Sequence, residues 1–140
     1  MALPETVVDA SVVVKWFLHE PRRAEALTLL HLYQEERITL VAPILLVAEV
    51  ANVLSKRVRR GLATAAIAMD AYQLLKINAP ILVDDRLLLE EAMALAVGSG
   101  QAVYDCLYLA LALRRGCHLI TADLKFHAAV SSKFPSVLHL

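Results

Sequence analysis

Short apolar runs rich in β-branched residues alternate along this chain with longer segments of helical period. This alternation is typical of β-α-β units, in which helices cover both faces of a parallel sheet. We therefore predict one α/β domain over residues 1–140, a length that can bury a large core without disulfides. The expected strands are 6–9, 38–41, 81–83, 118–121 and 137–139, and the expected helices are 11–18, 24–35, 44–59, 63–76, 86–97, 103–115 and a short one starting near 123.

Composition narrows the class of protein. Hydrophobic residues make up 59% of the chain, yet charged residues interrupt every apolar run before it reaches the length of a membrane-spanning helix. Glu5 and Asp9 lie in an N-terminal segment without a basic opening, which does not resemble a secretory signal, so we expect a cytoplasmic protein. The 14 basic and 14 acidic residues cancel, so any site for a polyanion must be local.

Two acidic residues follow expected strands. Asp9 ends the first strand and Asp123 comes directly after strand 118–121. Ligands of open parallel sheets bind beyond the carboxyl ends of the strands, where the strand order reverses. If these two strands are neighbours, both carboxylates point into the same crevice.

Two further acids lie on expected helices. Asp105 is in the first turn of helix 103–115, where the helix dipole favours its charged form. Glu49 lies at the edge of the apolar stripe of helix 44–59, where an unpaired charge is costly. Carboxylates that gather closely repel one another unless a cation neutralises them, and oxygen ligands suit Mg²⁺ or Mn²⁺. Such ions promote hydrolysis of phosphate esters.

Each acid has a simpler interpretation when taken alone. Asp9 and Asp123 are typical helix-capping or turn residues, and Ser11 can cap helix 11–18. Asp105 has the common place of an acid in a first turn, and Glu49 can be a solvated helix position. The hypothesis of a metal site therefore depends on the four acids as a set.

Four stretches carry these acids in a fixed order: Val-Val-Asp-Ala-Ser at 7–11, Ala-Glu-Val-Ala-Asn-Val-Leu at 48–54, Tyr-Asp-Cys-Leu-Tyr-Leu-Ala-Leu-Ala at 104–112 and Leu-Ile-Thr-Ala-Asp-Leu-Lys-Phe at 119–126. In order and spacing they resemble the four motifs of the PIN-domain nucleases, and most closely the VapC-type toxins of toxin-antitoxin pairs. Lys125 stands where some family members add another acid, which argues against a second firmly held metal.

The resemblance implies a three-layer α/β/α sandwich with a parallel five-stranded sheet of order 3-2-1-4-5. It implies an Mg²⁺- or Mn²⁺-dependent endoribonuclease with a hydrogen-bonding pair near the metal, Ser11 and Thr121. It also implies a homodimer held by the early helices, and a small antitoxin partner whose C-terminal segment lies along the toxin groove. The implied metal ligands are Asp9, Glu49, Asp105 and Asp123.

Two competing functions remain at this stage. One is a catalytically inactive PIN-like interaction module whose acidic pocket docks a basic partner segment. The other is a phosphotransfer receiver or haloacid-type phosphatase, which ranks lower because position 11 is Ser, where a haloacid-type site needs a second Asp.

Two charged clusters also have open roles. The basic cluster of residues 56–60, which consists of Lys56, Arg57, Arg59 and Arg60, can hold RNA phosphates or complement the dipole at the end of its helix. Asp84 and Asp85 follow strand 81–83, and we interpret them as turn and capping residues.

Overall fold

A five-stranded parallel sheet forms the centre of the computed structural model, which describes residues 2–140. The strand order is β3-β2-β1-β4-β5, and every neighbouring pair is parallel, as the sequence analysis predicts. The central strand is buried from both faces, since Val7 and Val8 are fully inaccessible to solvent. The strands are β1 (Glu5–Val8), β2 (Thr39–Pro43), β3 (Ile81–Val83), β4 (His118–Thr121) and β5 (Val137–His139).

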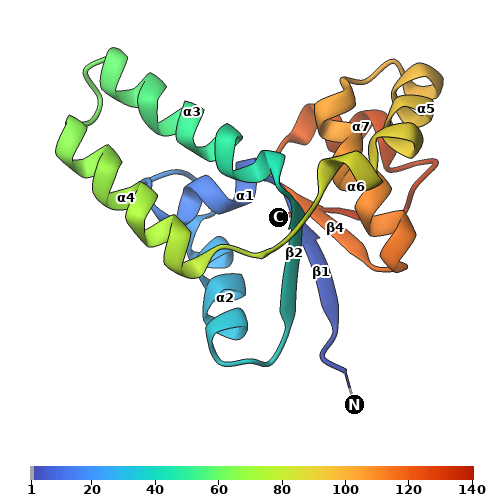
Figure 1. The fold of residues 1–140 in the computed structure, drawn as a ribbon, viewed down its shortest axis with the longest axis horizontal. Helices are drawn as coiled ribbons and strands as arrows, with labels where there is room; N and C mark the ends of the chain where they lie inside the picture. Colours follow the sequence, from blue (N-terminus) through green and yellow to red (C-terminus); the bar gives the residue numbers. More distant parts are fainter. Residues whose placement is uncertain (1) are drawn as a thin grey trace.

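Helices cover both faces of the sheet, so the predicted three-layer α/β/α architecture is confirmed (Figure 1). Figure 1 shows the first four helices on one side of the sheet and the last three on the other. The helices are α1 (Ala10–Val13), α2 (Arg23–Gln34), α3 (Leu45–Arg59), α4 (Ala65–Asn78), α5 (Leu89–Ser99), α6 (Val103–Arg115) and α7 (Leu124–Val130), with 3-10 turns η1 (Val14–Trp16) and η2 (Asp85–Leu87).

Helix α6 is the main packing element on its side of the sheet. It contacts β1, β2 and β4, and its residues from Cys106 to Ala112 are all buried. Gly116 follows the helix at φ +62°, a left-handed conformation that glycine adopts without steric cost and that turns the chain into β4. This connection carries the chain from Asp105, near the start of α6, to Asp123, just beyond β4.

Helices α3 and α4 pack against each other as a hairpin that projects away from the sheet (Figure 1). The base of the hairpin is fixed by Asp85, whose Oδ1 accepts a hydrogen bond of 3.2 Å from the N–H of Leu45, the first residue of α3. Asp84 accepts from the N–H of Arg86 at 2.9 Å and caps η2. Both acids are therefore capping residues, as the sequence analysis favoured.

Two local expectations at the carboxyl edge of the sheet are wrong. Ser11 does not cap a helix, because α1 begins at Ala10 and is followed directly by η1, which ends at Trp16. Strand β2 continues through Pro43, two residues further than expected, and Pro43 pairs with Val83. The N–H of Ile44 donates to the carbonyl of Val83 at 3.0 Å, so the nitrogen of Pro43 faces β1, whose pairing with β2 ends at Val41. The missing N–H of proline therefore costs no ladder hydrogen bond.

Within residues 2–140, no single helix is both long and apolar enough to cross a bilayer. Helices α5 and α6 together have the required length and composition, but the chain bends by 116° between them.

Candidate active site

The acidic motifs meet at a cavity of about 270 Å³ beyond the carboxyl ends of β1 and β4. Asp9 follows β1, Asp123 follows β4, Glu49 comes from α3 and Asp105 from α6. Of the predicted site residues, only Thr121 does not line the cavity, and it lies directly behind the cavity wall, in contact with Ser11. The principal lining residues are Asp9, Ser11, Asn52, Glu49, Asp105, Tyr108 and Asp123.

Asp9 is the deepest of these acids. It occupies the N-cap position of α1, and its Oδ1 accepts a hydrogen bond of 2.5 Å from the Ser11 hydroxyl. Burial raises the pKa of Asp9 from 3.8 to about 6, against the opposing effect of hydrogen bonding by Ser11 and Thr121. The nearby charge of Asp105 raises this pKa further, which shows that the two carboxylates interact electrostatically.

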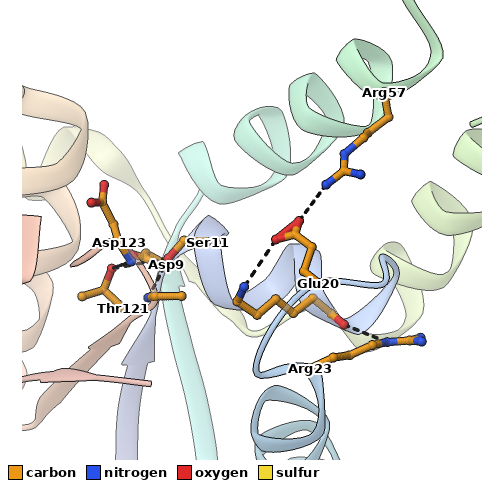
Figure 2. A network of polar contacts seen from close by, with 9 residues as sticks. Asp9, Ser11, Glu20, Arg23, Arg57, Thr121 and Asp123 are labelled. Atoms are coloured by element: carbon orange, nitrogen blue, oxygen red, sulfur yellow. Dashed lines mark hydrogen bonds and ion pairs between the residues drawn. The ribbon is translucent and has the colours of Figure 1, made fainter. Parts of the chain in front are cut away.

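Ser11 and Thr121 tie the two strand ends together (Figure 2). The Ser11 hydroxyl accepts a hydrogen bond of 2.8 Å from the N–H of Ala122, and its oxygen lies 3.4 Å from the Thr121 hydroxyl oxygen. The Thr121 hydroxyl accepts from the N–H of Asp123 at 3.0 Å. These bonds fix the backbone that carries Asp9 and Asp123, although the two segments are more than 100 residues apart in sequence.

Tyr108 is a site residue that the sequence analysis missed. Its hydroxyl donates a hydrogen bond of 2.6 Å to Oε1 of Glu49, and the ring is buried in the core. In the sequence analysis, Tyr108 is included only as a member of the motif at 104–112 and is given no role. A usable signal was its spacing, because a residue three positions after Asp105 lies on the same face of the helix.

Glu49 and Asp105, which are half-buried, are electrostatically linked to the other acids as well. Burial raises the pKa of Glu49, the Tyr108 hydrogen bond opposes this, and the charges of Asp105 and Asp9 raise it again. Burial also raises the pKa of Asp105, and the charge of Asp123 adds to the effect. Asp123 itself is exposed and caps α7, accepting a hydrogen bond of 3.0 Å from the N–H of Phe126.

No basic side chain neutralises this cluster. Among residues 2–140, none of the ion pairs includes any of the four acids, and the cavity lining contains no Lys, Arg or His. A set of carboxylate oxygens without a protein cation is the donor set that Mg²⁺ and Mn²⁺ prefer. By donor type and charge, the residues fit a divalent metal ion.

The side chains are not already drawn together around one point. No three His, Cys, Asp or Glu side chains within residues 2–140 form a group that could hold a metal ion as they stand. Asp9 and Glu49 instead direct oxygens toward Ser11 and Tyr108. To share an ion, the carboxylates would have to turn toward one another across the cavity.

Comparison with known proteins decides the family. A family model described as the PIN domain matches residues 6–130 of the chain. The chain belongs to the PIN domain family. Among PIN proteins, it is 33% identical to Ribonuclease VapC3 of Pyrobaculum aerophilum over 139 residues, which cover 94% of this chain and 96% of that relative. It is therefore a PIN protein of the VapC type.

Three solved structures share the fold of this chain. PAE2754 from Pyrobaculum aerophilum superimposes with a TM-score of 0.72 at 23% identity, covering 98% of this chain and 91% of that one. VapC20 of Mycobacterium tuberculosis, described as a sarcin-ricin loop cleaving toxin, gives 0.64 at 17% identity, covering 89% and 94%. VapBC2 of Rickettsia felis, bound to a DNA fragment from its promoter, gives 0.63 at 14% identity, covering 97% of both chains.

Proposed function

We propose that this VapC-type PIN protein is a metal-dependent endoribonuclease, the toxin of a toxin-antitoxin pair, and that it cuts RNA phosphodiester bonds in the acidic cavity. The observation that carries the proposal is the meeting of four carboxylates from four separate motifs at one cavity, where no side chain of residues 2–140 supplies a neutralising cation. The similarity to Ribonuclease VapC3 over nearly the whole chain supports RNA as the substrate. A cytoplasmic location goes with this proposal, because RNA and a co-expressed antitoxin are found there.

The four acids would hold Mg²⁺ or Mn²⁺. Bound there, the ion would supply Lewis-acid stabilisation of the negative charge that develops on the phosphate and would make a nearby water easier to deprotonate. Asp9 is prepared for this role by its burial, because a carboxylate with a pKa of about 6 gains from a close positive charge. The four proposed ligands are Asp9, Glu49, Asp105 and Asp123.

Three neighbouring side chains would orient the ligands. Ser11 and Thr121 hold the two strand ends in register, and the Ser11 hydroxyl limits the rotation of the Asp9 carboxylate. Tyr108 holds Glu49 from the core side through its hydroxyl. Hydrogen bonds of this kind fix ligand orientation and lower the reorganisation needed when the ligand binds.

The partners that we propose are a small antitoxin and a second copy of the chain. An antitoxin segment with a basic side chain could neutralise the cavity, which has no cation of its own among the described residues. A homodimer is the expected assembly. Size-exclusion chromatography with light scattering tests the dimer, and co-purification with the product of an adjacent small gene tests the antitoxin.

Cleavage of a labelled RNA by the purified chain is the direct test of the proposed function. Cleavage is expected with Mg²⁺ or Mn²⁺, and it should stop when EDTA is added. The variants Asp9→Asn and Asp105→Asn should retain the fold, shown by circular dichroism, and lose cleavage. A wild-type chain that neither cleaves RNA nor binds Mn²⁺ in calorimetry would instead support the inactive interaction module.

A further inference from the structure

Two basic residues lie on the same face of α3 as Glu49, which lines the acidic cavity. An α-helix has 3.6 residues per turn, so residues seven and eleven positions after Glu49 return to within about 20° of its direction. These residues are Lys56 and Arg60, and Asn52, one turn after Glu49, also lines the cavity. At about 1.5 Å per residue, the two cations lie about 10 Å and about 16 Å along the helix from Glu49.

Lys56 and Arg60 are the members of the basic cluster that remain available. Both are exposed, and within the described residues neither forms an ion pair. Arg57, by contrast, pairs with Glu20 at 3.0 Å (Figure 2), and Arg59 donates to a serine hydroxyl of its own helix. Within residues 2–140, Arg57 is therefore the member of the cluster with an ion pair, Arg59 has one hydrogen bond to a neutral serine, and Lys56 and Arg60 have neither an ion pair nor a side-chain hydrogen bond.

Helix capping does not account for the pair. Main-chain donors already satisfy the carbonyls of Lys56, Arg57 and Val58, since the N–H of Arg60 donates to Lys56 O at 3.0 Å, that of Leu62 to Arg57 O at 2.9 Å and that of Gly61 to Val58 O at 3.0 Å. Gly61 permits this closure through its φ of +71°. The helix dipole favours cations anywhere around the last turn, so it does not explain why two of them lie on the Glu49 face.

Lys56 and Arg60 repel each other, and a bound anion would remove this repulsion. Like charges four residues apart on one helix face repel each other, and no acidic residue lies between or beside Lys56 and Arg60 in the helix sequence. The acidic cavity also repels a polyanion, and the chain has zero net charge with which to attract one. Phosphate groups placed along this face would satisfy both cations and hold the strand close to the cavity.

We propose that Lys56 and Arg60 bind phosphates of the RNA strand on one side of the bond that is cut. This inference rests on the proposed ribonuclease function. Phosphate contacts of this kind supply affinity and set the position of the strand, while they carry no base specificity. The pair therefore affects how RNA binds and leaves the chemistry of the cavity unchanged.

The test compares two double variants that remove the same charge. Lys56→Gln/Arg60→Gln changes the proposed face, and Arg37→Gln/Lys133→Gln removes two exposed cations that precede β2 and β5, at the opposite edge of the sheet. Binding of a fluorescent single-stranded RNA is measured by anisotropy over a range of salt, in an Asp105→Asn background that prevents cleavage. The slope of log affinity against log salt should become less negative by about 1.4 for the first variant, about 0.7 per lost phosphate contact, and should not change for the second.

A cleavage assay separates this inference from the function on which it rests. With wild-type Asp105 restored, the Lys56→Gln/Arg60→Gln variant should show a higher KM for a long RNA and an unchanged kcat/KM for a dinucleotide that is too short to extend along α3. Equal salt slopes for all proteins, or equal flattening by both double variants, would overturn the assignment of these two cations while leaving the ribonuclease function intact. Failure of the wild-type chain to cleave either RNA would overturn the proposed function, and this inference with it.

Discussion

Asp9 shows how burial prepares a single side chain for a cation. Burial raises the pKa of Asp9 to about 6. The carboxylate is still charged at neutral pH, but burial makes this charge unfavourable. Asn keeps the shape and can still accept the hydrogen bond from Ser11, but it carries no charge. We predict that Asp9→Asn, in EDTA at pH 8, is more stable than wild type by roughly 1–3 kcal/mol.

The same Asp9 substitution should lower RNA cleavage by more than about a hundredfold, because a proposed metal ligand is lost. Urea unfolding followed by the fluorescence of Trp16, the single tryptophan, measures the first effect. A gel assay with Mg²⁺ measures the second. A variant that is less stable than wild type in EDTA would contradict the electrostatic argument, whatever its activity.

A second prediction concerns the hydroxyl group of Tyr108. Tyr108→Phe removes the 2.6 Å hydrogen bond to Glu49 and leaves the ring in the core. Hydrogen bonds to charged groups contribute about 1.5–3 kcal/mol, so kcat/KM should fall roughly 10- to 100-fold if Glu49 is a ligand. This bond favours the charged form of Glu49, so its loss should raise the pKa of Glu49 and move the acid limb of the rate profile to higher pH.

Tyr104→Phe is the matched control for this substitution. Tyr104 lies on the same helix, one turn before Tyr108, and its side chain is 64% exposed. Its hydroxyl takes part in none of the described side-chain hydrogen bonds, so both the activity and the pH profile should be those of wild type. If the two Phe variants behave alike, Tyr108 does not position Glu49.

At the scale of elements, an ion-pair network joins the turn after η1 to α3. Glu20 accepts from the Lys15 ammonium at 3.3 Å and from the Arg57 guanidinium at 3.0 Å (Figure 2). Arg23 stabilises the same turn, because its guanidinium donates a hydrogen bond of 3.1 Å to the carbonyl oxygen of Lys15. The network therefore links the segment that follows Asp9 to the helix that carries Glu49.

We predict that Glu20→Gln destabilises the protein by about 1–3 kcal/mol, because Lys15 is only 8% exposed and would lose its charged partner. Glu25→Gln is the control, since its pair with Arg22 is about half exposed on both sides and should contribute less than about 0.5 kcal/mol. Urea unfolding of both variants gives the comparison. Equal stabilities would mean that the network contributes no more than a surface pair.

Elements with strong local signals were predicted closely. Helix α6, β4 and β5 have the predicted boundaries, because a long apolar stripe ends at a glycine and two short apolar runs follow. The first helix was predicted less well. Its backbone is held by the hydrogen bond from the N–H of Ala122 to the Ser11 hydroxyl. These residues are 111 positions apart, so the local sequence pattern cannot predict the contact.

At the scale of the whole molecule, topology explains why the acids could be predicted as a set. Asp9 and Asp123 follow strands that are parallel neighbours. Strand order alone therefore brings the two residues to the same edge of the sheet. The strand order itself came from the family resemblance. The contact between Tyr108 and Glu49 was not predictable, because it depends on how α6 is rotated relative to α3, which periodicity does not fix.

The acids of the cavity also determine how the stability of the metal-free protein depends on pH. Asp9, Glu49 and Asp105 all have a raised pKa in the folded protein, with burial as the largest cause. Above the ordinary pKa values of these acids, the folded state therefore holds protons that the unfolded chain has released, and for Asp9 this window extends from about pH 4 to about pH 6. Stability must then fall as pH rises through this window and stay lower above it. For Asp9 alone, the rise from 3.8 to about 6 corresponds to at most about 3 kcal/mol.

A divalent cation reverses this dependence because it favours the charged carboxylates and binds only the folded arrangement. We predict that wild type in EDTA is less stable at pH 8 than at pH 5, and that saturating Mg²⁺ stabilises it at pH 8 and has little effect at pH 5. The informative quantity is the difference from Asp9→Asn/Asp105→Asn, because all other titratable residues are the same in that variant and in wild type. Urea unfolding at both pH values gives that difference. If it is the same at pH 5 and pH 8 in EDTA, the pKa values of Asp9 and Asp105 are not raised in the folded protein, and the electrostatic argument for a cation fails.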